Sequence, residues 1–232
     1  MTRTSTSTST STGRSRSRTR SRSRIRPRRA LATAALALAA AGAVTACGAG
    51  FGAGSGAALP PDPKVGSTVA AADPVAKVAH ALPKSRPTGM KIDAAGVDAK
   101  RMVGLTVDAA GELGVPDAET EADTPGWWTG GVTPGERGVS VLVAHFDTKF
   151  GPALMKDVKK IKLGDLVEVP REDGKTATFK IREIEDVNKK DFPTDKVYGA
   201  TDRPELRLLT CGGEIKDGHR TNNVIFYGDL VA

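Results

Sequence analysis

Short apolar segments of strand length, each ended by Gly, Pro or Asp, recur through residues 88–232 of this chain. No stretch there has the apolar spacing of a long amphipathic helix. Ala177, Phe179 and Ile181 alternate with polar residues, which is the pattern of a half-buried strand. Just before them, Asp173-Gly174 supplies a hairpin turn. Short strands joined by such turns predict an all-β fold, either a barrel or a sandwich.

Seven strands are predicted, at Met90–Ile92, Met102–Val107, Val139–Ala144, Asp165–Val169, Thr176–Ile184, Glu205–Cys211 and Asn223–Val231. Short helices are predicted at Ala153–Lys160, at Thr194–Tyr198 and near Gly111–Val115. About 145 residues are enough to bury one core without disulfides. We favour a closed barrel with short helices in its connections.

The front of the chain predicts an export signal rather than a folded unit. Residues 1–29 hold ten arginines and no acid, and residues 30–44 are an uncharged Ala/Leu-rich run. Small residues then follow up to Cys47, so we assign residues 1–46 to a secretory signal. A single N-terminal transmembrane helix is the alternative, but a span needs about 20 apolar residues.

Val44-Thr45-Ala46-Cys47 resembles the lipobox of bacterial lipoproteins. That resemblance implies that Cys47 is lipidated and becomes the new N-terminus, which would hold the protein at the outer face of the cytoplasmic membrane. Arg28-Arg29 leaves the twin-arginine export route open beside the general secretory one. Residues 47–87 are rich in Gly, Ala and Pro and predict a flexible spacer, with a short helix at Ala71–Leu82.

The basic character of the chain belongs to the export signal. The whole chain carries 34 Lys and Arg against 27 Asp and Glu, a net charge of +7. Loss of the ten signal arginines leaves 24 basic against 27 acidic residues, close to −3. A nucleic-acid partner is therefore not expected for the remaining domain.

Cys211 ends an apolar strand and is followed by two glycines, so its sulfur is predicted at the rim of a sheet. Because Cys47 has another role, Cys211 has no obvious disulfide partner and is a candidate reactive thiol. Histidine is the usual proton partner of such a thiol. His145 ends another strand and is the candidate, whereas His80 lies in the spacer and is expected to be inert. The residues alone equally allow a buried structural Cys211 and a His145 that caps its strand.

Two arginines near Cys211 could stabilise an oxyanion. Arg207 lies four residues before it, about 13 Å along a strand, and is expected to be a solvated charge. Arg220 precedes the last strand, which could return beside Cys211, so geometry favours Arg220.

Many blocks, in one order, resemble the sortases, cysteine transpeptidases of Gram-positive cell surfaces, and most closely their actinobacterial class F. They cover nearly all of residues 92–227 and are Gly126-Trp127-Trp128, Pro134-Gly135-Glu136-Arg137-Gly138, His145-Phe146-Asp147, Gly151-Pro152-Ala153, Leu163-Gly164-Asp165, Phe192-Pro193-Thr194, Val197-Tyr198-Gly199, Arg203-Pro204-Glu205-Leu206-Arg207 and Thr210-Cys211. Two details differ, since Ala144 stands where members carry glycine and Arg220 fits the final loop only after a shift of about one residue.

The resemblance implies an eight-stranded sortase-type β-barrel over residues 88–232 and attack by the Cys211 thiolate on the Thr–Gly bond of a Leu-Pro-X-Thr-Gly-like sorting signal. His145 would protonate the leaving amine and then deprotonate an incoming amine of the cell wall or of another protein, or water. Arg220 would hold the scissile carbonyl oxygen, and Thr210 would be a further substrate contact. Surface proteins that carry such a signal are the implied partners.

Neither a cofactor nor a metal is expected, because the acidic residues Glu119, Glu121 and Asp123 fit a solvated loop better than a calcium site. Two other functions are weighed. In L,D-transpeptidases the histidine lies close before a Gly-Cys pair, whereas here 66 residues separate His145 from Cys211 and Thr precedes the cysteine. A membrane-tethered domain that binds wall peptides without turnover is the non-enzymatic alternative.

Overall fold

A computed structural model describes residues 58–71 and 79–231 of the chain. The signal sequence, Cys47 and most of the helix predicted at Ala71–Leu82 lie outside the described residues. The division of the chain at 46/47 and 87/88 stays a prediction.

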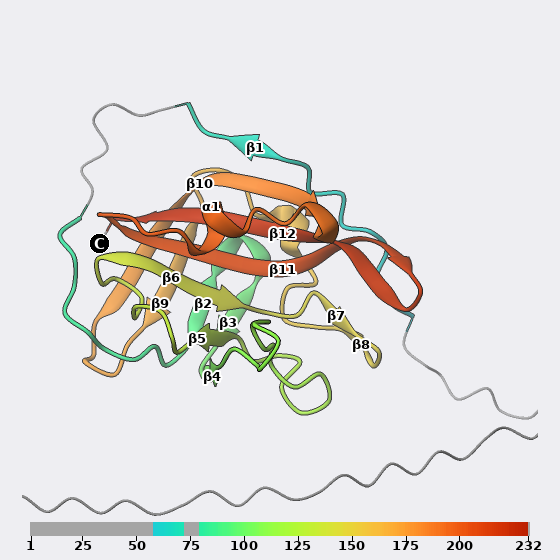
Figure 1. The fold of residues 1–232 in the computed structure, drawn as a ribbon, viewed down its shortest axis with the longest axis horizontal. Coiled ribbons are helices and arrows are strands. Elements are labelled where there is room, and N and C mark those ends of the chain that lie inside the picture. Colours follow the sequence, from blue (N-terminus) through green and yellow to red (C-terminus); the bar gives the residue numbers. More distant parts are fainter. Residues whose placement is uncertain (1–57, 72–78, 232) are drawn as a thin grey trace, which may run out of the picture. The chain divides into compact units, whose positions relative to one another are not determined.

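One large sheet forms the body of the domain (Figure 1). Its hydrogen-bonded order is β3 (Val97–Ala99), β2 (Met90–Ile92), β9 (Leu166–Pro170), β10 (Thr176–Asn188), β12 (His219–Leu230), β11 (Pro204–Lys216), β6 (Gly138–Val143), β5 (Gly126–Trp128) and β4 (Val103–Leu105). β1 (Thr68–Val69) pairs with β10, and a separate hairpin consists of β7 (Asp147–Thr148) and β8 (Gly151–Pro152). The predicted all-β barrel architecture is confirmed, although the curled sheet is not closed by hydrogen bonds between its end strands β3 and β4.

The sequence alternation correctly predicted which side of β10 faces the core. Ala177, Phe179 and Ile181 are all buried, with exposures of 1% or less. A bulge between Ile181 and Glu183 then changes the phase of the strand, so that Ile184 is the next buried residue. The strand continues to Asn188, beyond the predicted end at Ile184, because its pairing with β12 continues that far.

The predicted helices had mixed outcomes. Thr194–Tyr198 is α1, as predicted. The helix predicted at Ala153–Lys160 is wrong, since only the 3-10 turn η2 (Val158–Lys160) forms there. The backbone N–H groups of Ala153 and Met155 donate to the carbonyls of Phe146 and His145 instead of to a helical ladder.

The helix predicted near Gly111–Val115 is also wrong. The Asp108 carboxylate accepts hydrogen bonds from the N–H groups of Ala110 and Glu112, and Gly111 adopts a φ of +86°, so the chain makes a tight turn there. The other 3-10 turns are η1 (Asp93–Ala95) and η3 (Lys189–Asp191).

Parts of the predicted spacer pack on the barrel. Besides the pairing of β1 with β10, the N–H of Leu82 donates to Gly135 O, and the buried Arg171 guanidinium donates to the carbonyls of Pro83 and Pro134. The chain is thus held against the domain before β2 begins.

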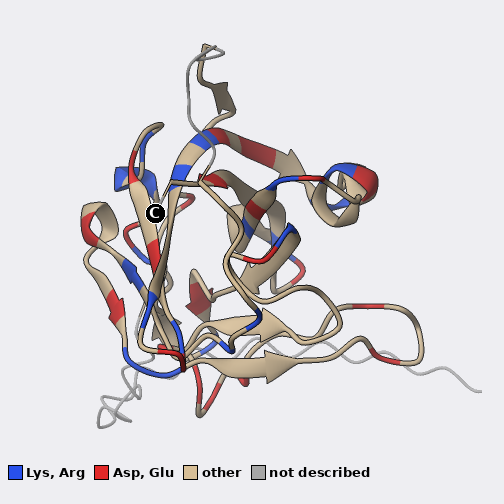
Figure 2. Cartoon of the chain, turned by 90° about the vertical axis from the view of Figure 1, so that its left-hand side faces the viewer, with Lys and Arg blue, Asp and Glu red and all other residues tan. Residues whose placement is uncertain are grey.

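Acidic and basic segments are interspersed in the view of Figure 2 rather than gathered into one area of a single sign. Within residues 58–71 and 79–231, no helix has the length and apolar character needed to cross a membrane.

Candidate active site

Pairing of β6 with β11 brings two chemically relevant residues to one end of the sheet. The strands are parallel, with Leu208 beside Leu142 and Leu209 beside Val143, and the N–H of Ala144 donates to Leu209 O. The ladder between them ends at Leu209 and Val143, and Cys211 and His145 each follow two residues later at that end of the sheet.

Side chains alternate between two faces of β6, β11 and β12. The inner face carries the main core, including Leu142, Leu208, Val224 and Phe226. The outer face, on which α1 packs, carries a smaller cluster formed by Val141, Leu209, Ile225 and Tyr227 with Val197 of α1. Cys211 lies in β11 two residues after Leu209 of this cluster, but its partly buried side chain packs against the main core. His145 lies beyond the end of β6, between the core residues Ala144 and Phe146.

His145 is held by the loop that precedes β5 and by the turn that follows β8. Its Nε2–H donates to Pro116 O at 2.7 Å, and its backbone carbonyl accepts from the N–H of Met155 at 2.8 Å. Because a carbonyl can only accept, Nε2 carries a proton, and Nδ1 is the nitrogen free to exchange one.

A carboxylate next to this loop faces the same imidazole. Hydrogen bonds from the Thr120 N–H and hydroxyl, and from the Glu119 N–H, hold the pKa of Asp117 below its ordinary value, and the charge of His145 lowers it further. Asp117 is exposed, so its effect on His145 is screened by solvent.

Cys211 is a free thiol that is partly accessible to solvent. Lys189, the first residue of η3, places its Nζ 3.7 Å from the Cys211 sulfur. The sulfur therefore has an ammonium group as a direct neighbour, and the imidazole follows the adjacent strand β6.

Thr210 lies next to Cys211, but its side chain faces the core. The residue is 3% exposed, and its hydroxyl has no hydrogen-bond partner among the described protein groups. Substrate contact by Thr210 stays a prediction.

Arg220 is not brought to the sulfur. Its guanidinium, 5% exposed, pairs with the Asp147 carboxylate at 2.7 Å and donates to Gly213 O at 2.8 Å and to Pro60 O, while it stacks on the Phe146 ring. These groups lie toward the inner face of β12. In the ladder between β11 and β12, the residue directly beside Cys211 is Asn223, whereas Arg220 pairs with Ile215.

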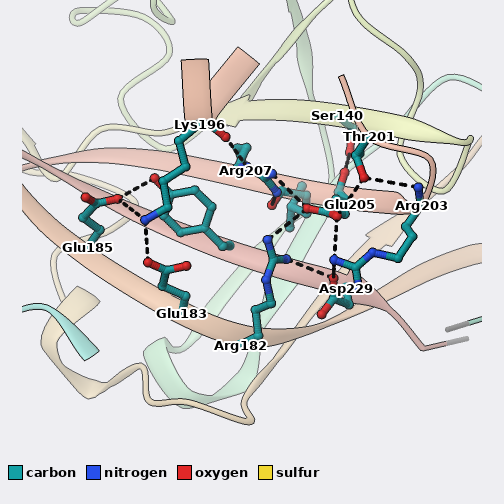
Figure 3. Close-up of polar contacts among 12 residues, drawn as sticks. Ser140, Arg182, Glu183, Glu185, Lys196, Thr201, Arg203, Glu205, Arg207 and Asp229 are labelled. Atoms are coloured by element: carbon teal, nitrogen blue, oxygen red, sulfur yellow. Dashed lines mark hydrogen bonds and ion pairs between the residues drawn. The ribbon is translucent and has the colours of Figure 1, made fainter. Parts of the chain in front are cut away.

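Arg207 is buried, so the prediction that it would be a solvated charge is wrong. Its Nη2 pairs with Glu205 at 2.8 Å, its Nε donates to Lys196 O at 3.2 Å, and its guanidinium lies 4.8 Å from the centre of the Tyr227 ring (Figure 3). Arg207 therefore links β11 to α1, and its guanidinium is engaged by Glu205 and the Lys196 carbonyl.

Glu205 is the centre of a larger polar network. It also pairs with Arg182 at 3.0 Å and with Arg203 at 2.8 Å, and accepts from the Thr201 hydroxyl (Figure 3). Burial alone would raise the pKa of Glu205, but the charges of Arg182 and Arg207 outweigh it and hold the pKa below the ordinary value. The network ties Thr201 and Arg203, which precede β11, to Arg182 of β10.

Sequence reasoning missed Lys189 and the Pro116 carbonyl. Neither has a local signal, because both act through contacts with strands distant in sequence. Lys189 could be identified only once β10 was known to pair with β12 up to Asn188.

The comparisons with known proteins agree on one family. A family model described as a sortase domain matches residues 90–231. No curated protein matches the sequence.

Three solved structures illustrate the likeness of fold. The Clostridium perfringens sortase D5 transpeptidase is 16% identical, with a TM-score of 0.47 over 65% of this chain and 83% of that chain. A C. perfringens sortase C with a C-terminal cell wall sorting motif is 21% identical, with a TM-score of 0.47 over 65% and 74%. Listeria monocytogenes sortase A is 14% identical, with a TM-score of 0.44 over 63% and 88%.

Proposed function

We propose a function from one established premise: this chain belongs to the sortase family, since the sortase domain covers residues 90–231. The proposed reaction is cysteine transpeptidation. The Cys211 thiolate attacks the Thr–Gly bond of a Leu-Pro-X-Thr-Gly-like sorting signal, the amine leaves, and the acyl group stays on sulfur as a thioester. An amine of the cell wall or of another protein, or water, then takes the acyl group.

The observation that supports this proposal most is the parallel pairing of β6 with β11, because His145 and the free, partly accessible Cys211 each follow two residues after its last pair, at the same end of the sheet. With Nε2 bonded to Pro116 O, Nδ1 is the atom that gives a proton to the leaving amine and takes one from the incoming amine. The motif blocks further support assignment to class F.

The experiment is turnover of a sorting-signal reporter peptide by the full chain, with and without an amine acceptor. Cleavage that shifts from hydrolysis to an amide product as acceptor is added is the expected result. Absence of cleavage under both conditions would contradict the proposal.

The second candidate is a tethered sortase-like domain that binds wall peptides without turnover. The contacts of Arg220 favour it, because the Asp147 carboxylate and the Pro60 carbonyl already engage the guanidinium. Peptide binding by an inactive parent protein would identify this case.

Arg220 remains our prediction for the oxyanion donor. Its bond to Pro60 O is a bond to a peptide carbonyl, and in the proposed role a substrate carbonyl replaces it. Arg220→Ala is then expected to lower turnover by about 10²-fold or more, as loss of an oxyanion donor does. The measurement is kcat/KM with the reporter peptide, alongside the thermal midpoint.

Asp147→Asn is the matched control, because it removes the ion pair and keeps the guanidinium. A loss of turnover as large as that of Arg220→Ala would show that Arg220 acts by supporting the structure. A loss in Arg207→Ala alone would assign the essential arginine to Arg207.

For localisation we propose export, cleavage after Ala46 and lipid anchoring through Cys47, with the domain on the outer face of the cytoplasmic membrane. Cys47→Ala is expected to release the protein to the medium or to leave it unprocessed, as fractionation and N-terminal mass analysis would reveal. Cys211→Ala should leave anchoring unchanged. Membrane retention of Cys47→Ala with its original N-terminus would instead indicate an uncleaved helix.

A further inference from the structure

The Cys211 sulfur has a cationic neighbour that the proposed reaction does not yet use. Lys189 Nζ lies 3.7 Å from Sγ, within hydrogen-bond range for sulfur. Lys189 is itself exposed and has no ion pair with a carboxylate among the described residues. Its charge is thus available to the sulfur.

The fold explains how a residue of β10 reaches a residue of β11. β12 lies between them, and Asn223 pairs with Cys211 on one side and with Val187 on the other. β10 and β11 are therefore two strand spacings apart, about 10 Å. The long side chain of a lysine on β10's side covers most of that distance.

The local turn structure fixes the position of the Lys189 backbone. The Asn188 side chain accepts from the N–H of Lys190 at 3.0 Å and so starts the η3 turn directly after β10. Lys189 is two residues beyond Val187, whose side chain packs in the outer-face cluster. Lys190, one residue further, makes no such contact with the sulfur and provides a neighbour of the same charge.

We propose that Lys189 is the charge partner of the Cys211 sulfur and stabilises its anionic, nucleophilic form; this inference rests on the proposed function. The thiolate is the attacking species in such chemistry, and a cation at this distance favours the anion over the neutral thiol. The ammonium holds the sulfur's charge through space, and no proton need pass between the two groups. The Arg220 guanidinium, by contrast, is already paired with the Asp147 carboxylate.

The test is alkylation of Cys211 in the full chain, with site-resolved mass spectrometry of the peptide that contains it. Lys189→Met keeps an unbranched apolar side chain and removes the charge. It should slow alkylation by neutral iodoacetamide about fivefold. Alkylation by anionic iodoacetate should slow further, because the ammonium also attracts that reagent. Lys189→Arg should stay within about twofold of the parent protein.

Lys190→Met is the matched control and should alkylate at the parent rate. High salt should bring the parent protein toward Lys189→Met, because screening weakens an exposed charge. Equal alkylation of Lys189→Met and parent, or equal slowing by Lys190→Met, would overturn the inference. Alkylation needs no sorting peptide, so this result is independent of whether the chain turns such peptides over.

Discussion

Cys211→Ala is expected to abolish turnover of the sorting-signal reporter, with a loss of at least about 10⁴-fold, because removal of a nucleophile leaves only binding and polarisation. His145→Ala is expected to lose about 10²- to 10⁴-fold, the usual range for a missing acid–base group. The measurement is the initial rate of reporter cleavage, with thermal midpoints to show that both variants fold.

His80→Ala is the matched control, since His80 is an exposed histidine of the predicted spacer. It should retain the parent rate. Turnover by Cys211→Ala comparable to the parent would rule out a thioester mechanism at this position. An unaffected His145→Ala would remove the imidazole from the reaction.

Glu205→Leu is expected to destabilise the fold by about 3–5 kcal/mol, because it leaves Arg207 buried without its carboxylate partner. The side chains of Glu205 and Arg207 are 4% and 6% exposed, so water cannot replace the lost contact. Chemical denaturation gives the free energy of unfolding. The double variant Glu205→Leu/Arg207→Leu should recover part of the loss, since apolar replacement of both partners leaves no unpaired charge.

Glu172→Leu is the comparison for an exposed pair, because Glu172 and its partner Arg86 are both largely solvent-accessible. Its effect should stay within about 1 kcal/mol. A loss in Glu205→Leu no larger than that of Glu172→Leu would contradict the structural role of the network.

The same carboxylate gives the fold a pH dependence. Since the pKa of folded Glu205 is below that of an unfolded glutamate, about 4.3, its contribution is fully present above that pH and is lost as pH falls through the folded pKa. Part of the parent protein's acid destabilisation should therefore be missing in the double variant.

The strands that anchor the fold could be predicted from local pattern. Six long or strongly apolar segments and Met90–Ile92 correspond to β2, β4, β6, β9, β10, β11 and β12. Strands of two or three residues, such as β3 and β7, have too few positions to show an alternation. Their pairing depends on partners brought close by the rest of the fold.

Cys211 and His145 carry a local signal, because each closes an apolar segment of the sequence, and their roles stay predictions. β11 itself continues past Cys211 to Lys216. The surroundings of Arg220 were harder to predict. It was expected before the last strand but lies within β12, paired with Asp147. Lys189 depends on a strand order that no local pattern encodes.

Intact-protein mass spectrometry after brief incubation with a sorting-signal peptide tests the central claim most directly. The account predicts an added mass equal to the acyl fragment up to threonine, mapped to Cys211, released by hydroxylamine and absent from Cys211→Ala. Peptide cleavage without any adduct at Cys211, or an adduct that persists in Cys211→Ala, would contradict it.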